Sequence, residues 1–134
     1  MDTSFAKIWL RLEGLAALVV ASLLYQHFGL RWLWFGLLFF VPDLTIAGYL
    51  AGARIGAWIY NLAHSYATAG IVLGTGLVIE LTGMHSPVLL SVGLIWCAHI
   101  GFDRMLGYGL KSPEGFGYTH LGKIGGNKSS TGSF

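Results

Sequence analysis

The stretch WCAHIGFDRMLGYGLK, at residues 96–111, closes the last long apolar run of the chain and decides how the rest is interpreted. It places a histidine, an aspartate and an arginine (His99, Asp103 and Arg104) within six residues of one another. Ionisable side chains are costly inside a bilayer, and those that occur there are usually functional. We therefore expect His99 and Asp103 to belong to a polar site inside a membrane-embedded helical bundle.

The composition supports a membrane location for this site. Of the 134 residues, 54% are hydrophobic and only 10% are charged, and the mean hydropathy is +0.65. These values are typical of an integral membrane protein of one domain. The net charge of +2 is too small and too dispersed to favour a nucleic-acid partner. A single cysteine, Cys97, excludes an intramolecular disulfide and a multi-cysteine zinc site.

Four apolar segments predict an all-α bundle of four transmembrane helices. Each is close to the roughly 20 residues that span a bilayer, and they cover approximately residues 8–28, 32–50, 55–81 and 87–106. We expect a transmembrane domain over residues 1–124 and a flexible tail over 125–134, where the sequence is rich in glycine and serine. Glycines spaced four apart, Gly52 with Gly56 and Gly70 with Gly74, predict close helix packing.

The basic residues predict the orientation in the membrane. If both termini share one side, only Arg31 lies on the opposite side, and the other basic residues gather with the termini: Lys7, Arg11, Arg54, Arg104, Lys111, Lys123 and Lys128. Basic residues accumulate in cytoplasmic loops. We therefore expect both termini to be cytoplasmic.

Each predicted helix carries a polar group at a similar depth: Glu13, Asp43, His64 and His99. At a rise of about 1.5 Å per residue, these groups lie about 10–13 Å inside the cytoplasmic face. Asp103 follows His99 by one helical turn and so shares its face. This convergence predicts one polar chamber.

Buried carboxylates must be protonated, paired with a cation or bound to a metal ion. Together with two imidazoles, they form a nitrogen and oxygen ligand set that suits zinc, manganese or iron. Simpler interpretations remain open for single residues. His99 and Asp103 can form a local hydrogen bond, Asp43 can satisfy backbone groups freed by Pro42, and Glu13 can pair with a nearby basic residue.

Four strings of the chain carry a family resemblance: FVPDLTIAGYL, RIGAWIYNLAHSY, HIGFDRMLGYGLK and GFGYTHLGKIG. They resemble the domain-of-unknown-function 4260 family of bacterial membrane proteins, which brings no established activity. The resemblance implies a multi-pass protein of the bacterial cytoplasmic (inner) membrane. The residues that it implies are Asp43, Asn61, His64, His99, Asp103, Arg104, Tyr108 and His120.

A second resemblance concerns the order of three short motifs. Pro42-Asp43, His64-Ser65 and the His99/Asp103 helix before a glycine-rich turn are similar to motifs of YdjM-type membrane-bound metal-dependent hydrolases. Two features of those motifs are missing here: a second acid after Pro-Asp, and a first histidine in the middle motif. The similarity is an analogy between short motifs.

The leading interpretation is a membrane-embedded metal-dependent hydrolase acting on a lipid or a lipid-linked substrate. The expected metal ligands are His64, His99, Asp103 and Asp43, with Asp43 or Glu13 as the catalytic base. Asn61 is expected either to form an interhelical hydrogen bond or to contact substrate. The other expected substrate-binding residues are Arg54, Arg104, Tyr108 and Lys111.

The alternative is a non-enzymatic small transporter, an ion or proton carrier, or a ligand-binding membrane subunit. Four helices are few for a pore through one chain, so transport would require a homo-oligomer. A carrier also needs polar groups that continue to the far face. Between the chamber and Glu80 or His85 the sequence is mostly apolar, which favours a site open from one side.

Overall fold

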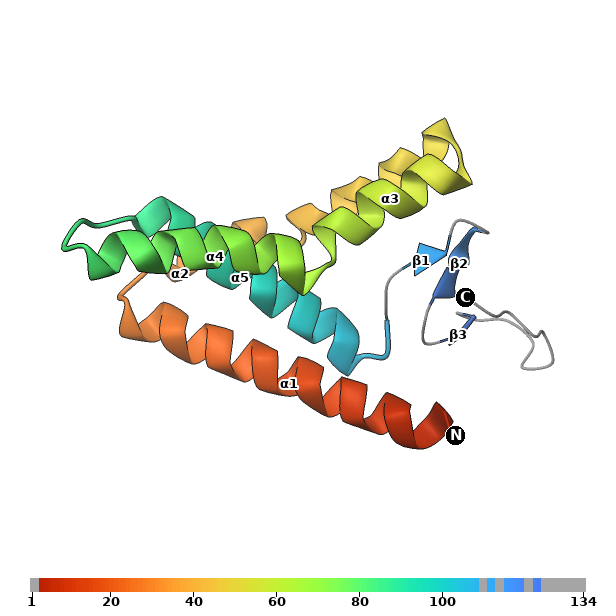
Figure 1. Ribbon diagram of the computed structural model, residues 1–134, viewed down its shortest axis with the longest axis horizontal. Coiled ribbons are helices and arrows are strands. Elements are labelled where there is room, and N and C mark those ends of the chain that lie inside the picture. Colours follow the sequence, from red (N-terminus) through yellow and green to blue (C-terminus); the bar gives the residue numbers. More distant parts are fainter. Residues whose placement is uncertain (1–2, 109–110, 113–114, 120–121, 124–134) are drawn as a thin grey trace.

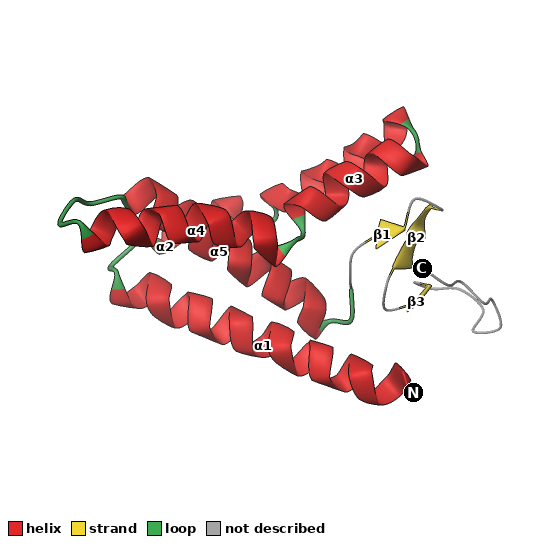
Figure 2. Ribbon diagram, viewed as in Figure 1, coloured by secondary structure: helices red, strands yellow, loops and turns green. Residues whose placement is uncertain are grey.

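A computed structural model describes residues 3–108, 111–112, 115–119 and 122–123 of the chain. Helices form most of the described structure (Figure 2). In chain order they are α1 (Thr3–His27), α2 (Trp32–Leu38), the 3-10 helix η1 (Val41–Ala51), α3 (Ala53–Ala63), α4 (Tyr66–Leu81) and α5 (Pro87–Met105).

These helices make four spans that are long and apolar enough to cross a membrane. The spans are Ser4–His27, Trp32–Ala51, Ala53–Leu81 and Pro87–Met105, which confirms the four predicted segments. Large apolar side chains point outward along them; Leu50 and Leu81, for example, are 92% and 86% exposed. Such an outward apolar surface fits lipid contact, since exposed apolar patches this extensive are rare on soluble monomers. The chain is a membrane protein.

Two of the four spans are broken, whereas the sequence predicted a continuous third helix. The second span changes from α2 to η1 just before Pro42, which lacks a backbone N–H. The third changes from α3 to α4 at His64 and Ser65. Ser65 has an extended backbone, and its side chain accepts a hydrogen bond from the Ala67 N–H at 3.2 Å, so it caps a new helix. The predicted third span, 55–81, is therefore present, but it consists of two helices and not one.

The last helix, α5, lies between α1 and α4 (Figure 1). Gly101 makes the contact with α1 close, because a Cβ placed there would lie 2.6 Å from the Gly14 carbonyl oxygen. Gly93 has the same role against α4, where the added atom would lie 2.6 Å from the Leu73 Cα. Gly70 and Gly74, which the sequence suggested for this role, have nothing within 4 Å. Of the other predicted pair, Gly56 does pack closely, since a Cβ there would lie 2.7 Å from the Tyr49 Cα, whereas Gly52 has nothing within 4 Å.

The turns alternate between the two ends of the molecule (Figure 1). The turns at residues 28–31 and 82–86 lie at one end, and the start of α1, the turn at Gly52 and the end of α5 lie toward the other. This alternation fits the start of α1 and the end of α5 on one side of the membrane. That this side is cytoplasmic stays a prediction.

Short strands follow α5, which the sequence analysis did not predict. They are β1 (Lys111–Ser112), β2 (Gly115–Thr119) and β3 (Gly122–Lys123), paired antiparallel in that order. β1 and β2 contact α3, so the chain folds back across this end of the bundle. The predicted flexible tail, 125–134, lies outside the described residues.

Candidate metal centre

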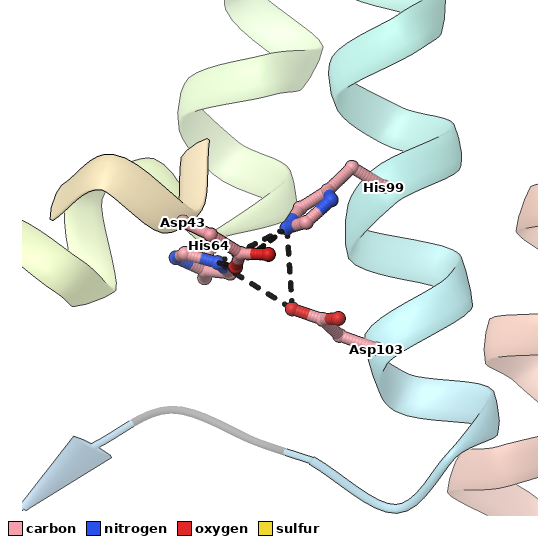
Figure 3. A group of neighbouring side chains, drawn as sticks. All are labelled: Asp43, His64, His99 and Asp103. Atoms are coloured by element: carbon pink, nitrogen blue, oxygen red, sulfur yellow. Dashed lines mark hydrogen bonds and ion pairs between the residues drawn. The ribbon is translucent and has the colours of Figure 1, made fainter. Parts of the chain in front are cut away.

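Four side chains from three separate parts of the sequence meet where the two broken spans face α5 (Figure 3). Asp43 comes from the first turn of η1, and His64 from the junction of α3 and α4. His99 and Asp103 lie one turn apart on α5. One ligand atom from each lies within 4.8 Å of the others, which is close enough to bind a single metal ion.

Five of the six distances between these atoms are short and nearly equal. Asp43 Oδ1 lies 3.1 Å from His64 Nε2 and 3.1 Å from His99 Nε2, and the two imidazole nitrogens are 3.2 Å apart. Asp103 Oδ2 lies 3.4 Å from His64 Nε2 and 3.3 Å from His99 Nε2. A tetrahedral ion with bonds of about 2.0–2.1 Å separates its ligand atoms by about 3.3 Å. The five distances lie close to that value, and the two carboxylate oxygens lie within 4.8 Å of each other.

One hydrogen bond determines which nitrogen His64 presents to the centre. His64 Nδ1 lies 2.9 Å from the Tyr60 carbonyl oxygen, and a carbonyl can only accept, so Nδ1 carries the proton. In the neutral ring the lone pair is then on Nε2, which points at the cluster. Fixing the tautomer through the second ring nitrogen is the usual arrangement of metal-bound histidines. The Tyr60 ring also stacks on His64, with centroids 3.8 Å apart.

The cluster therefore contains more acceptors than donors. His64 Nε2 presents its lone pair to Asp43 Oδ1 at 3.1 Å and to Asp103 Oδ2 at 3.4 Å, and both carboxylate oxygens present lone pairs in return. Such an arrangement is repulsive unless additional protons or a cation occupy the centre. A divalent cation satisfies every lone pair at once.

Burial increases the cost of leaving this centre without a cation. The His64 and His99 side chains are only 4% and 0% exposed, while those of Asp103 and Asp43 are 15% and 35% exposed. Asp43 is therefore the ligand most open to incoming molecules. His99 packs edge-on against the rings of Phe39 and Phe40, with centroids 5.3 and 6.2 Å away. Its Nδ1 is buried and has no hydrogen-bond partner in the described part of the chain.

Side chains of α5 satisfy the backbone carbonyls that the break in the third span releases. The Trp96 indole donates to the Ala63 carbonyl, and Arg104 Nη2 donates to the His64 carbonyl at 3.4 Å. Irregular backbone inside a membrane is tolerated where protein groups replace the missing helical bonds. The break is therefore held by the same helix that supplies His99 and Asp103.

The remaining predicted site residues lie outside the cluster. Glu13 is exposed on α1 and is not among the four clustered residues, so its role as a base stays a prediction. Arg54 and Asn61 line a different groove of about 490 Å³ beside α3 and the start of α4. Arg104 is half-buried next to the cluster, with its guanidinium 5.4 Å from the Tyr66 ring.

The residues that follow α5 are described less fully. The Tyr108 side chain is 41% exposed, and its backbone N–H donates to the Asp103 carbonyl at 2.8 Å. Lys111 begins β1, but its side chain lies outside the described part of the structure. His120 is also outside the described residues.

Comparison with known proteins supports the resemblance inferred from the sequence strings. The profile of a family described as Domain of unknown function (DUF4260) matches residues 7–124. The chain belongs to the DUF4260 family. No curated protein and no solved structure matches the chain. The match includes all four clustered residues of this DUF4260 protein, and the family description assigns them no role.

Two contributors to this DUF4260 centre could not be identified from sequence. Tyr60 acts through its backbone carbonyl and the stacking of its ring, and neither feature depends on a recognisable motif. Phe39 covers His99 from the break between α2 and η1. The Ser65 cap was visible in principle, because a serine after a histidine within an apolar run can start a new helix.

Proposed function

We propose that this DUF4260 protein is a membrane-embedded, metal-dependent hydrolase. The observation that carries the proposal is the convergence of four ligand atoms, with five of their six separations at 3.1–3.4 Å and with acceptors in excess. The donor set of two imidazoles and two carboxylates suits zinc, manganese or iron. A bound divalent ion would lower the pKa of a coordinated water toward about 7.

The two carboxylates have different roles in this proposal: Asp103 binds the metal ion and Asp43 is the general base. His64, His99 and Asp103 are the more buried three and would hold the ion. Three protein ligands would leave a position for water, as in catalytic zinc sites. Asp43, on the open side, takes a proton from the attacking water as general base. A lipid or lipid-linked substrate follows from the position of the cluster inside the spans, reached from the predicted cytoplasmic leaflet.

Metal analysis of the purified protein tests the first part of the proposal. We expect about one ion per chain in the wild type, by the ligand count, and loss of the ion in His99→Ala and Asp103→Ala. His85→Ala is the matched control, because His85 is 87% exposed at the opposite end of the bundle. A wild type that stays metal-free and shows unchanged stability with added zinc, manganese or iron would overturn the proposal.

The second part concerns Asp43 as the base. Turnover of small chromogenic phosphate and carboxylate esters by the metal-loaded protein provides the readout. Asp43→Asn should retain metal while lowering kcat by about 100-fold or more, the usual contribution of a general base. Unchanged kcat in that variant would exclude Asp43 from this role, and turnover independent of metal would exclude the hydrolase mechanism.

A second candidate is an ion carrier, and the broken spans favour it. Discontinuous helices at membrane depth are typical of transporter binding sites. The described residues between the cluster and the far end of α4 and α5 are mostly apolar until Glu80, whose carboxylate accepts hydrogen bonds at the start of α5. Zinc uptake into proteoliposomes discriminates: transport without hydrolysis would support the carrier.

A further inference from the structure

A second feature adjoins the cluster: an apolar groove of about 410 Å³ between the second span and α5. Its lining includes Pro42 and Ala63, the chain neighbours of Asp43 and His64. It also includes Trp96, which precedes His99 by one turn of α5. The groove therefore lies next to the cluster.

The groove has almost no polar group to offer an occupant. Thr45 directs its hydroxyl hydrogen to the Pro42 carbonyl at 2.6 Å, and Trp96 directs its indole N–H to the Ala63 carbonyl. The rest of the lining is leucine, valine, isoleucine, proline and alanine. Hydrocarbon is the chemistry that such a surface accommodates.

At the other side of the cluster, Arg104 supplies a positive charge. Its guanidinium makes one long hydrogen bond, to the His64 carbonyl at 3.4 Å, and lies against the Tyr66 ring. None of the ion pairs found among the described residues includes Arg104. Guanidinium groups bind phosphate oxygens with two parallel hydrogen bonds, which suits an anionic headgroup.

The three features follow one another along α5. Of the residues of α5, Val92, Ile95 and Trp96 line the groove. His99 and Asp103 follow and belong to the cluster, and Arg104 is the next residue along the helix. Eight residues separate Trp96 from Arg104, a rise of about 12 Å. An amphiphile with a hydrocarbon chain, an ester and a charged phosphate presents the same order.

We propose that the substrate is a membrane lipid that carries a terminal phosphate, with its hydrocarbon chain in the groove and its phosphate oxygens on Arg104. This inference rests on the proposed hydrolase function. Water attacks phosphorus, the bond from phosphorus to the lipid oxygen breaks, and that oxygen takes a proton. The products are a lipid alcohol and inorganic phosphate, and no oxidant or reductant is needed.

Fluorescence quenching at Trp96 tests this placement on the full chain. The other tryptophans are exposed and are changed to phenylalanine (Trp9→Phe, Trp32→Phe, Trp34→Phe and Trp58→Phe), leaving Trp96 alone. The zinc-loaded protein also carries Asp43→Asn, which should retain metal but slow hydrolysis, so that the phosphatidic acid is not consumed, and it is placed in phosphatidylcholine nanodiscs. Brominated acyl chains, which quench an indole on contact, are carried in turn by phosphatidic acid, by diacylglycerol and by phosphatidylcholine, each at the same low mole fraction.

We expect brominated phosphatidic acid to quench Trp96 about threefold more than the other two lipids, because charge-assisted hydrogen bonds enrich it at Arg104. Arg104→Gln should abolish this preference, and Arg104→Lys should retain part of it. Val92→Phe should also abolish it by filling the groove. Val78→Phe, at a lipid-facing position of α4 that lines neither this groove nor Arg104, should leave it unchanged.

Equal quenching by the three lipids, or a preference that persists in Arg104→Gln, would overturn the inference. Zinc content is measured on each sample so that the two proposals can fail separately. Zinc binding without lipid preference would reject the substrate class and leave the metal centre standing. A preference with no zinc bound would reject the metal-dependent hydrolase and retain the lipid site.

Discussion

At the scale of single residues, the main feature is an excess of lone pairs around one point. His64 is fixed by Tyr60 so that Nε2 faces the carboxylates of Asp43 and Asp103 without a hydrogen to offer in its neutral form. A local hydrogen bond between His99 and Asp103, which the sequence left open, would satisfy only one of these contacts. The geometry therefore favours an ion over a set of structural hydrogen bonds.

The excess of acceptors predicts that Asp103→Asn has opposite effects on the stability of the metal-free protein and on its stabilisation by zinc. Without metal, removal of one charge from a buried acceptor cluster should raise the free energy of unfolding by about 1 kcal/mol. With metal, the same change should remove most of the stabilisation that zinc gives. Thermal unfolding in detergent with and without zinc measures both. If the carboxylate instead serves as a hydrogen-bond acceptor for a protonated histidine, Asp103→Asn will destabilise the metal-free protein.

At the scale of elements, the helix breaks create the site. A straight third span would continue past His64 without releasing the carbonyls that Trp96 and Arg104 now occupy. The sequence predicted Pro42 as an interruption of the second span, and the change from α2 to η1 fits that expectation. It did not predict the break at Ser65, because the whole segment from 55 to 81 is apolar enough on average to form one span and contains no proline.

The close contacts of α5 give a prediction at this scale. Gly101→Ala and Gly93→Ala should each destabilise the protein by about 1–3 kcal/mol, since the new methyl group overlaps the backbone of α1 or α4. Gly70→Ala is the matched control; it has open space around it and should be neutral or stabilising, because alanine favours helix more than glycine does. Thermal unfolding of the three variants is the measurement. Equal effects at Gly70 and Gly101 would contradict the described packing.

At the scale of the whole molecule, the centre joins parts of the chain that few other contacts connect. Asp43 and His64 belong to the η1–α3 hairpin and its junction with α4, while His99 and Asp103 belong to the central helix α5 (Figure 3). A metal ion that binds only the folded state stabilises it by mass action. Metal binding should therefore hold the η1–α3 hairpin in contact with α5.

We accordingly expect zinc at about 100 times its dissociation constant to stabilise the protein by about 2.7 kcal/mol. A chelator should reverse the effect and increase proteolysis at the exposed turn near Leu50 and Gly52. His99→Ala should show neither response, whereas His85→Ala should respond as the wild type does. A chelator-insensitive cleavage rate would show that the hairpin is held without metal.

The orientation is also a property of the whole molecule. In a Cys97→Ser background, Leu50→Cys and Met84→Cys place single thiols at exposed positions near opposite ends of the bundle. Basic loops favour the cytoplasm, so the end that carries Leu50 is expected inside the cell and the end that carries Met84 outside. Met84→Cys should therefore react with an impermeant reagent added to intact cells. Leu50→Cys should react only after the membrane is opened. The reverse pattern would place the termini outside.

The sequence by itself determined the four spans, the membrane location and the identity of the four clustered residues. Those conclusions depend on length, hydropathy and the rarity of ionisable groups in apolar runs, all of which are local properties. Only the tertiary structure decided that Glu13 lies outside the cluster, because depth along a helix does not specify which way a side chain points. It also decided the glycine contacts, the Tyr60 carbonyl as the partner of His64 and the groove beside Trp96, since each arises between elements whose relative rotation is set by packing.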